Sequence, residues 1–230
     1  MKICAIIPAA GQGTRIGGPV PKQFLRLNGK PILHYTLAAF EKCELVCSVV
    51  LVMPEKEVEA GRAEWSDRSD ISVVIGGEQR QDSVYNGFKA LDKDTEIVIV
   101  HDGVRPFVSP QIILQTIDAA CKYGAAITAI PVSDTIKQVA SGGLVERTVD
   151  RSGLWRVQTP QAFRYSVLEE AFKKAYAESF YGTDEGALVE HIGKEVKVVP
   201  GSELNIKITR PEDLVLGECI ANAHLRIEKE

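Results

Sequence analysis

Five short runs rich in valine, isoleucine and alanine recur along the chain and constrain its fold more than any other feature. They are Ile3–Ile7, Val49–Met53, Ile71–Ile75, Ile97–Val100 and Ala126–Val132. Each run is continuous rather than alternating with polar residues. Continuous apolar runs are typical of strands whose two faces are both covered by helices, as in a parallel sheet. The runs therefore predict a buried, mostly parallel sheet.

Segments with helical periodicity lie between these runs. The apolar stripes that predict them are Leu33, Leu37 and Phe40, then Val84, Gly87, Phe88 and Leu91, and then Ile113, Ile117 and Ala120. Ser109 followed by Pro110 is a start signal for the third helix. Thr209 and Glu212 have the spacing of a capping box ahead of a last helix. The alternation predicts an α/β fold, with a Rossmann-like, mostly parallel sheet flanked by helices.

One segment, from Asp134 to Gln158, breaks this alternation. Two polar runs, Thr135–Val139 and Leu144–Val149, surround the turn sequence Ala140-Ser141-Gly142-Gly143, which indicates a β-hairpin. Few of its residues are large and apolar, so we expect a projecting arm whose edges are covered by a partner subunit. Without repeats or a long linker, the sequence predicts one domain over residues 1–230, with the arm at roughly 134–158 inserted in it.

Charge and composition exclude several classes of protein. The chain has 230 residues, with 27 Lys and Arg against 31 Asp and Glu, a net charge of −4. A protein that coats phosphate backbones leans basic, so general nucleic-acid binding is disfavoured. The sequence shows no run of the ~20 apolar residues that a membrane span needs, and we expect no signal peptide. Five scattered cysteines indicate a reducing compartment. We therefore expect a cytoplasmic protein without a membrane partner.

The glycine-rich stretch from Pro8 to Gln23 is the most informative for function. It follows the first predicted strand directly, at the carboxyl end, where open α/β sheets bind ligands. Ile16 stands where a dinucleotide fingerprint has its third glycine, and no Gly-Lys-Ser/Thr closes a Walker A loop. Arg15 and Lys22 add two cations. A glycine-rich turn with solvated cations is the alternative, but the position and the paired cations favour a polyphosphate site.

Motifs along almost the whole chain, in one order, carry a resemblance to a known family. Gly11-x-Gly13-Thr14-Arg15 with Pro21-Lys22-Gln23 resembles the sugar-phosphate nucleotidyltransferases, and Pro8-Ala9-Ala10-Gly11 resembles the 2-C-methyl-D-erythritol 4-phosphate cytidylyltransferase family of the non-mevalonate isoprenoid pathway. The further matching motifs are Gly76-Gly77-Glu78-x-Arg80-x-x-Ser83-Val84, Val100-His101-Asp102-Gly103-x-Arg105-Pro106, Pro131-Val132-x-Asp134-Thr135-Ile136-Lys137, Thr148-Val149-Asp150-Arg151, Gln158-Thr159-Pro160-Gln161, Thr183-Asp184-Glu185 and Asn205-Ile206-Lys207.

The resemblance implies transfer of the cytidylyl group of CTP to 2-C-methyl-D-erythritol 4-phosphate with Mg²⁺ or another divalent cation. It implies that Arg15 and Lys22 are catalytic. It implies nucleotide binding by Ala9, Ala10, Gly11, Gly13, Gly77, Glu78, Ser83, Asp102 and Gly103. It implies substrate binding by Asp102, Arg105, Thr135, Arg151, Thr159, Thr183 and Lys207, with Asp102 also as metal ligand. Thr135 and Arg151 would act in the neighbouring subunit of a homodimer that forms through the arm.

Two alternative functions stay open at this point. A ribitol-5-phosphate cytidylyltransferase is one, because Val104 stands where those enzymes often have valine, although the loop Ala9-Ala10-Gly11 and the run Thr148–Arg151 favour methylerythritol phosphate. A non-catalytic nucleotide-binding module is the other, and intact Arg15, Lys22 and Asp102 argue against it. Taken alone, Ser83 is equally a helix-start residue and Asp102 a polar strand cap. His101 is expected to pack or hydrogen-bond rather than act as a base.

Overall fold

A seven-stranded sheet forms the centre of the computed structural model, which describes residues 1–11 and 21–227, with side chains up to residue 223. The strand order is β11-β7-β10-β6-β1-β4-β5. The five predicted strands are confirmed as β1 (Ile3–Pro8), β4 (Ser48–Met53), β5 (Ile71–Ile75), β6 (Ile97–Val100) and β7 (Ala125–Pro131). Two further strands, β10 (Trp155–Arg164) and β11 (Lys197–Pro200), were not predicted. β10 is antiparallel to both of its neighbours, β6 and β7, whereas the other neighbouring strands of the sheet pair in parallel. The sheet is therefore mostly parallel, as expected.

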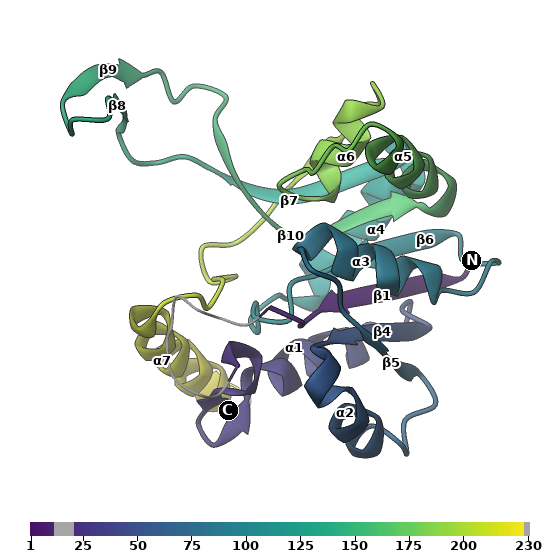
Figure 1. Cartoon of the computed structure of the whole chain (residues 1–230). Helices are drawn as coiled ribbons and strands as arrows, with labels where there is room; N and C mark the ends of the chain where they lie inside the picture. The colour runs from purple at the N-terminus through teal and green to yellow at the C-terminus, as the bar shows by residue number, and fades with distance from the viewer. Residues whose placement is uncertain (12–20, 228–230) are drawn as a thin grey trace.

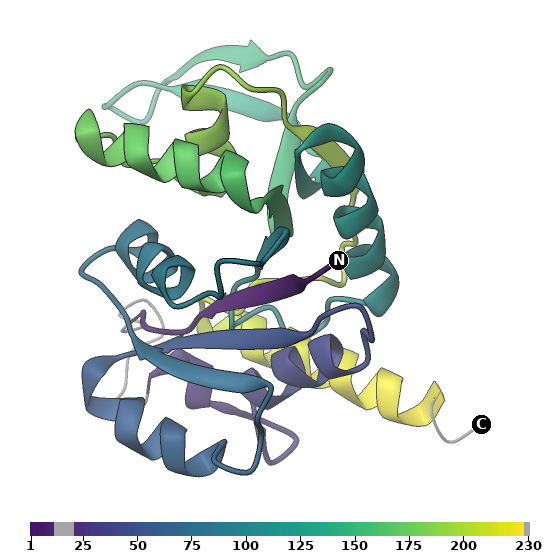
Figure 2. The same cartoon turned by 90° about the vertical axis from the view of Figure 1, so that its right-hand side faces the viewer.

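Helices cover both faces of this sheet, which is why its central strands β1, β4 and β6 are almost entirely apolar (Figures 1 and 2). Successive residues of β1 point to opposite faces, since Ile3, Ala5 and Ile7 join one core cluster while Cys4 and Ile6 join the other. The first cluster includes residues of α1 (Ile32–Glu41), α2 (Val58–Glu64) and α4 (Pro110–Tyr123). The second includes residues of α3 (Arg80–Lys89), α5 (Tyr165–Ala177) and α6 (Glu185–His191).

Helix α7 (Pro211–Ile227) covers a smaller cluster beside the hairpin of β2 (Arg26–Leu27) and β3 (Lys30–Pro31). Short 3-10 turns lie at Lys22–Phe24 and Glu55–Glu57. In the described part of the chain, none of the helices has both the length and the apolar character needed to cross a bilayer. All five cysteines are free thiols.

Two helix starts test the predicted caps. Ser109 caps α4 as expected, because its hydroxyl accepts a hydrogen bond from the Ile112 amide at 3.3 Å. The predicted pairing of Thr209 with Glu212 is wrong. Asp213 Oδ2 instead accepts from the amides of Thr209 and Arg210, at 2.8 Å each. The reason is that Pro211 takes the first helical position, which places Asp213 rather than Glu212 at the third.

The predicted hairpin is confirmed as β8 (Ile136–Val139) paired antiparallel with β9 (Val145–Val149). It extends away from the sheet beyond β7 and β10 (Figure 1), and most of its residues are exposed. Gly143 closes the turn with a φ of 78°, in the left-handed region that favours glycine. The predicted arm ends too late in the chain. Trp155, Arg156 and Val157 already pair with β7 in the main sheet, so the part outside that sheet ends at residue 154.

The parallel arrangement decides where the loops meet. β1, β4, β5 and β6 run in the same direction, so their carboxyl ends, from Pro8 to Val100, lie at one edge of the sheet. The glycine-rich loop, the Gly76-Gly77 loop and the His101-Asp102 loop all start from this edge. Open α/β sheets bind their ligands at such an edge.

Candidate active site

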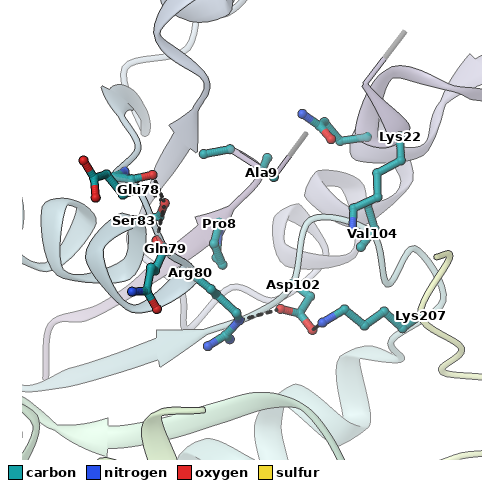
Figure 3. A pocket seen from close by; sticks show the side chains of 14 residues that line it. Pro8, Ala9, Lys22, Glu78, Gln79, Arg80, Ser83, Asp102, Val104 and Lys207 are labelled. Carbon is teal, nitrogen blue, oxygen red and sulfur yellow. Dashed lines mark hydrogen bonds and ion pairs between the residues drawn. The ribbon is translucent and has the colours of Figure 1, made fainter. Parts of the chain in front are cut away.

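Three loops from this edge of the sheet surround a cleft of about 390 Å³ (Figure 3). One follows β1, the second follows β5 and the third follows β6, and Lys22 and Lys207 approach from other segments. The residues that line the cleft are Pro8, Ala9, Ala10, Gly11, Lys22, Gln23, Gly77, Glu78, Gln79, Arg80, Ser83, Asp102, Val104 and Lys207. Nine of these were predicted as site residues. Residues as far apart in the sequence as Pro8 and Lys207 thus meet in one place.

Two glycines allow the loop after β5 to pack tightly. A Cβ atom at Gly76 would lie 2.3 Å from the Ala10 Cβ, and one at Gly77 would lie 2.3 Å from the Asp82 Cβ. Real Cβ atoms essentially never approach that closely. Ser83 then holds the loop, because its hydroxyl accepts from the Gly77 amide at 3.0 Å and lies 3.1 Å from the Gln79 carbonyl. Ser83 is thus both a helix-start residue and a wall of the cleft.

Asp102 lies at the centre of the charges in the cleft. Its carboxylate follows the end of β6 and is buried, with Oδ1 3.2 Å from Arg80 Nε. Its Oδ2 lies 2.8 Å from Lys207 Nζ and 3.4 Å from Arg105 Nε. Burial alone would raise the pKa of Asp102, but the three cations hold this pKa well below its usual range. Asp102 is therefore ionised throughout the physiological range.

A second cavity, of about 240 Å³, shares Arg80, Asp102 and Lys207 with the cleft. The other residues that line it are Arg105, Val157, Gln158, Thr159, Gln161, Thr183 and Asp184. Arg105 comes from the loop after β6, Val157 to Gln161 come from β10, which lies beside β6 in the strand order, and Thr183 and Asp184 come from the segment before α6. The three shared residues mark the junction of the two cavities. A ligand in each cavity would therefore contact the same charged groups.

A buried hydrogen-bond network supports this junction. Thr159 Oγ1 accepts from the Asp102 amide at 3.0 Å and donates to His101 Nδ1 at 3.1 Å, because the neutral His101 ring carries its proton on Nε2. His101 Nε2 in turn donates to the Arg105 carbonyl at 3.0 Å. The side-chain amide of Asn205 donates to the Thr159 backbone carbonyl at 2.8 Å, and the backbone carbonyl of Asn205 accepts from Arg105 Nη1 at 2.7 Å.

His101 belongs to this network and has no exposed surface. Burial lowers the pKa of His101 from 6.5 to about 4, so the ring is neutral at pH 7. Both ring nitrogens are engaged, one by Thr159 and one by the Arg105 carbonyl. The expectation that His101 packs and hydrogen-bonds agrees with this placement.

The structure brings most of the predicted site residues together. In the cleft are Ala9, Ala10, Gly11, Lys22, Gly77, Glu78, Ser83, Asp102 and Lys207. In the second cavity are Arg105, Thr159 and Thr183, again with Asp102 and Lys207. Gly103 is buried behind the cleft, where an added Cβ would lie 3.1 Å from the Ala9 Cβ. Gly13 and Arg15 lie outside the described residues.

Thr135 and Arg151 are not brought to this site. Both are exposed on the arm and line neither cavity, and Arg151 donates to the Ser133 carbonyl of its own arm. Their proposed action on a neighbouring subunit stays a prediction.

Arg80, at the junction, and its partner Glu185 were not assigned a catalytic or binding role from the sequence. Arg80 Nη1 donates to both carboxylate oxygens of Glu185, at 2.8 and 3.0 Å, while its Nε contacts Asp102. Each residue stands inside a motif that carried the resemblance. Their pairing was invisible in the sequence, because 105 positions separate them and no local pattern links α3 to α6.

A protein-built metal centre is not present in the part of the chain that the structure describes. No group of three or more His, Cys, Asp or Glu side chains there could hold a metal ion. Asp102, the predicted ligand, already has cations on both carboxylate oxygens.

Comparison with known proteins agrees with the resemblance seen in the sequence. The family model for 2-C-methyl-D-erythritol 4-phosphate cytidylyltransferase matches residues 3–223. A relative of that name from Geobacillus kaustophilus is 48% identical over 219 residues, covering 94% of this chain and 95% of its own. Another, from Syntrophus aciditrophicus, is 45% identical over 221 residues, covering 94% of each.

Solved structures agree in fold over nearly the whole chain. The 4-diphosphocytidyl-2C-methyl-D-erythritol synthase from Anaerococcus prevotii superposes with a TM-score of 0.85 at 33% identity, covering 96% of each chain. The 2-C-methyl-D-erythritol 4-phosphate cytidylyltransferase from Thermus thermophilus has a TM-score of 0.82 at 35% identity, covering 96% of this chain and all of its own. The chain therefore belongs to the 2-C-methyl-D-erythritol 4-phosphate cytidylyltransferase family, whose members are CTP-dependent nucleotidyltransferases of isoprenoid precursor synthesis.

Proposed function

We propose that the larger cleft binds CTP and the second cavity binds 2-C-methyl-D-erythritol 4-phosphate, so that the cytidylyl group passes between them. The observation that carries this assignment is the junction, where both cavities share Arg80, Asp102 and Lys207. A transfer reaction needs its two substrates in contact, and binding them in adjoining cavities aligns the reacting phosphates. Membership of the family supplies the identity of the two substrates.

The loops of the larger cleft fit a nucleotide. We assign Ala9, Ala10, Gly11 and Gly13 to the triphosphate, because small residues let backbone amides approach phosphate oxygens. Gly77, Glu78 and Ser83 would meet the cytosine, and Asp102 and Gly103 the ribose side of the nucleotide. The close packing around Gly76 and Gly77 supports a rigid loop as the wall that the planar base would meet.

The chemistry requires alignment and charge neutralisation rather than a base. An oxygen of the acceptor phosphate attacks the α-phosphorus of CTP, and the bond from that phosphorus to the bridging oxygen breaks. Pyrophosphate leaves with the electron pair of that bond. The attacking phosphate is already an anion at neutral pH, so no proton must be removed. Arg15 and Lys22 would stabilise the charge of the transition state and of the pyrophosphate.

The acceptor is held by groups suited to a polyol phosphate. Arg105 and Lys207 supply cations, and Thr183 supplies a hydroxyl group on the same cavity, which Thr159 also lines. The exposed arm supports a homodimer in which Thr135 and Arg151 of the partner subunit reach the acceptor phosphate. Since both cavities and the base of the arm belong to one sheet, we propose one transferase domain over residues 1–230. We also propose that it acts in the cytoplasm.

The residues present fit Mg²⁺ as an ion that the triphosphate carries. Mg²⁺ commonly binds through substrate phosphates, water and one or two carboxylates. Asp102 is the carboxylate available, and it would have to release Arg80 or Lys207 to become a direct ligand. Bound in this way, Mg²⁺ or another divalent cation neutralises charge on the triphosphate and on the leaving pyrophosphate.

The position of Val104 bears on the alternative acceptor, ribitol 5-phosphate. Val104 lines the larger cleft and does not line the second cavity. Its side chain is buried with Leu27, Ile32 and Ile208. The side chain at position 104 therefore does not contact the proposed acceptor site, and its identity does not bear directly on which acceptor binds there.

Pyrophosphate release with CTP, Mg²⁺ and a panel of polyol phosphates tests the function. Turnover with 2-C-methyl-D-erythritol 4-phosphate is expected. Turnover with ribitol 5-phosphate alone would reassign the acceptor. CTP binding without turnover on any acceptor would instead favour a nucleotide-binding module, and substitution of CTP by ATP, GTP or UTP tests the base.

A further inference from the structure

Glu185 is a buried carboxylate that none of the predicted roles uses. It is the first residue of α6 and is 1% exposed. Both of its oxygens accept from Arg80 Nη1, at 2.8 and 3.0 Å. Burial raises the pKa of Glu185, and the charge of Arg80 opposes this rise. A carboxylate this deeply buried is unfavourable unless it is paired, so its partner defines what it does.

That partner stands at the junction of the two proposed substrate cavities. Arg80 is the first residue of α3, lines both cavities, and places its Nε 3.2 Å from Asp102 Oδ1. Figure 3 shows Arg80, Asp102 and Lys207 in a row along one side of the cleft. Arg80 Nη2 is buried and has no hydrogen-bond partner among the described residues. Two of the three guanidinium nitrogens are thus fixed by carboxylates, and the third retains its N–H donors.

We propose that Glu185 is a positioning residue for the transfer reaction, which holds the Arg80 guanidinium at the junction so that its charge faces the substrate phosphates. The proposal rests on the assignment of the two cavities to CTP and a polyol phosphate. A guanidinium clamped on two sides presents its donors in a fixed direction, which suits the planar, two-point recognition of phosphate. Without Glu185, Arg80 keeps its charge but loses one of its two anchors.

Local charge is consistent with this role. The cluster holds three cations, Arg80, Arg105 and Lys207, against two carboxylates, Asp102 and Glu185. It therefore keeps one positive charge for an anionic substrate. The ion pair between Arg80 and Glu185 links Arg80 to the start of α6. Thr183 and Asp184, just before α6, line the second cavity and not the larger cleft. We therefore expect loss of Glu185 to disturb the acceptor more than CTP.

The test starts from the wild-type enzyme, whose turnover with CTP and 2-C-methyl-D-erythritol 4-phosphate checks the proposed function by itself. Glu185→Gln then keeps the shape of the side chain and removes its charge. Glu190→Gln is the matched control, because Glu190 is exposed on the same helix. For Glu185→Gln we expect kcat/KM for the acceptor to fall about tenfold or more, as for a misplaced positioning group. The Kd of CTP, titrated without acceptor, should stay within about twofold, because the base and triphosphate loops are unchanged.

A double-mutant cycle separates positioning from a purely structural effect. If Glu185 acts through Arg80, Glu185→Gln should change kcat/KM by less than about twofold in an Arg80→Lys background. Equal losses in both backgrounds would overturn the proposal, and so would wild-type kinetics in Glu185→Gln. Should Glu185→Gln fail to fold, Glu185→Asp is measured instead, since it keeps the charge but is too short to hold Arg80 in the same place. Acceptor kinetics like those of wild type in Glu185→Asp would then refute the role.

Discussion

Gly77→Ala is the sharpest perturbation that the cleft offers, because one methyl group changes the wall assigned to the cytosine. The new Cβ would lie 2.3 Å from the Asp82 Cβ and 2.9 Å from the Asp82 backbone carbonyl carbon. Ordinary contact begins near 3.4 Å. Because a backbone atom is among the obstacles, no rotamer change relieves the clash, and the loop must move by about 1 Å.

A movement of this size removes the bond that holds the loop. The Gly77 amide donates to Ser83 Oγ at 3.0 Å, and a shift of about 1 Å takes it beyond hydrogen-bond distance. Loss of that bond costs about 0.5–1.5 kcal/mol, and misplacing a binding group by about 1 Å costs up to ~10²-fold in rate. The Kd of CTP should therefore rise by about tenfold or more, which corresponds to at least ~1.4 kcal/mol.

Isothermal titration with CTP and Mg²⁺ measures this Kd directly, and circular dichroism and thermal melting report the fold. Gly142→Ala is the matched control, because a Cβ at Gly142 in the arm turn meets nothing within 4 Å. Gly142→Ala should bind CTP like wild type. A folded Gly77→Ala protein with wild-type CTP affinity would refute the assignment of this loop to the nucleotide.

Three further predictions follow from the site. Lys22→Ala should lower kcat by about 10²-fold or more with little change in CTP affinity, and near-normal turnover would remove Lys22 from the transition state. Equimolar mixing of Arg151→Ala with Lys22→Ala subunits should restore about a quarter of wild-type activity, since random pairing gives one intact site in half of the dimers. No recovery despite proven subunit exchange would mean that Arg151 does not act across the interface. Because burial lowers the pKa of His101 from 6.5 to about 4, the stability due to its neutral ring is present above pH 6.5 and lost as the pH falls toward 4. The loss amounts to about 3 kcal/mol. His101→Gln should therefore flatten the pH dependence of urea unfolding in that window, and an unchanged slope would contradict this account.

The parallel core of the sheet was predictable because its signals are local. β1, β4, β5 and β6 match the expected runs to within one residue, since continuous apolar runs arise only when both faces are covered. β10 was missed for a physical reason. Pro160 stands inside it, and its pairing with β7 shifts register between Val157 and Gln161. A proline in mid-strand argues against a strand until an irregular register accommodates it.

The helix starts also divide into those that a local signal predicts and those that only the folded backbone decides. The cap at Ser109 was predictable, because the side chain and the amide it accepts from are three residues apart. The cap of α7 was misassigned by one residue, since the sequence offers both Glu212 and Asp213 and only the path of the backbone at Pro211 decides between them. The arm was predictable as a hairpin, but its length was not, because Trp155 pairs with Pro131, 24 positions earlier in the chain, and no local pattern signals that pairing.

The strand and helix alternation, the hairpin and the motif residues of the family could all be predicted from the sequence. These are properties of spacing and residue type over short stretches, and backbone geometry translates them directly into local structure. Which charges meet depends instead on tertiary packing. Arg80 lies 22 positions from Asp102 and 105 from Glu185, yet one guanidinium contacts both. Tertiary packing creates that contact, because α3 packs against β1 while α6 packs against α5 and β7, and these elements share one core cluster.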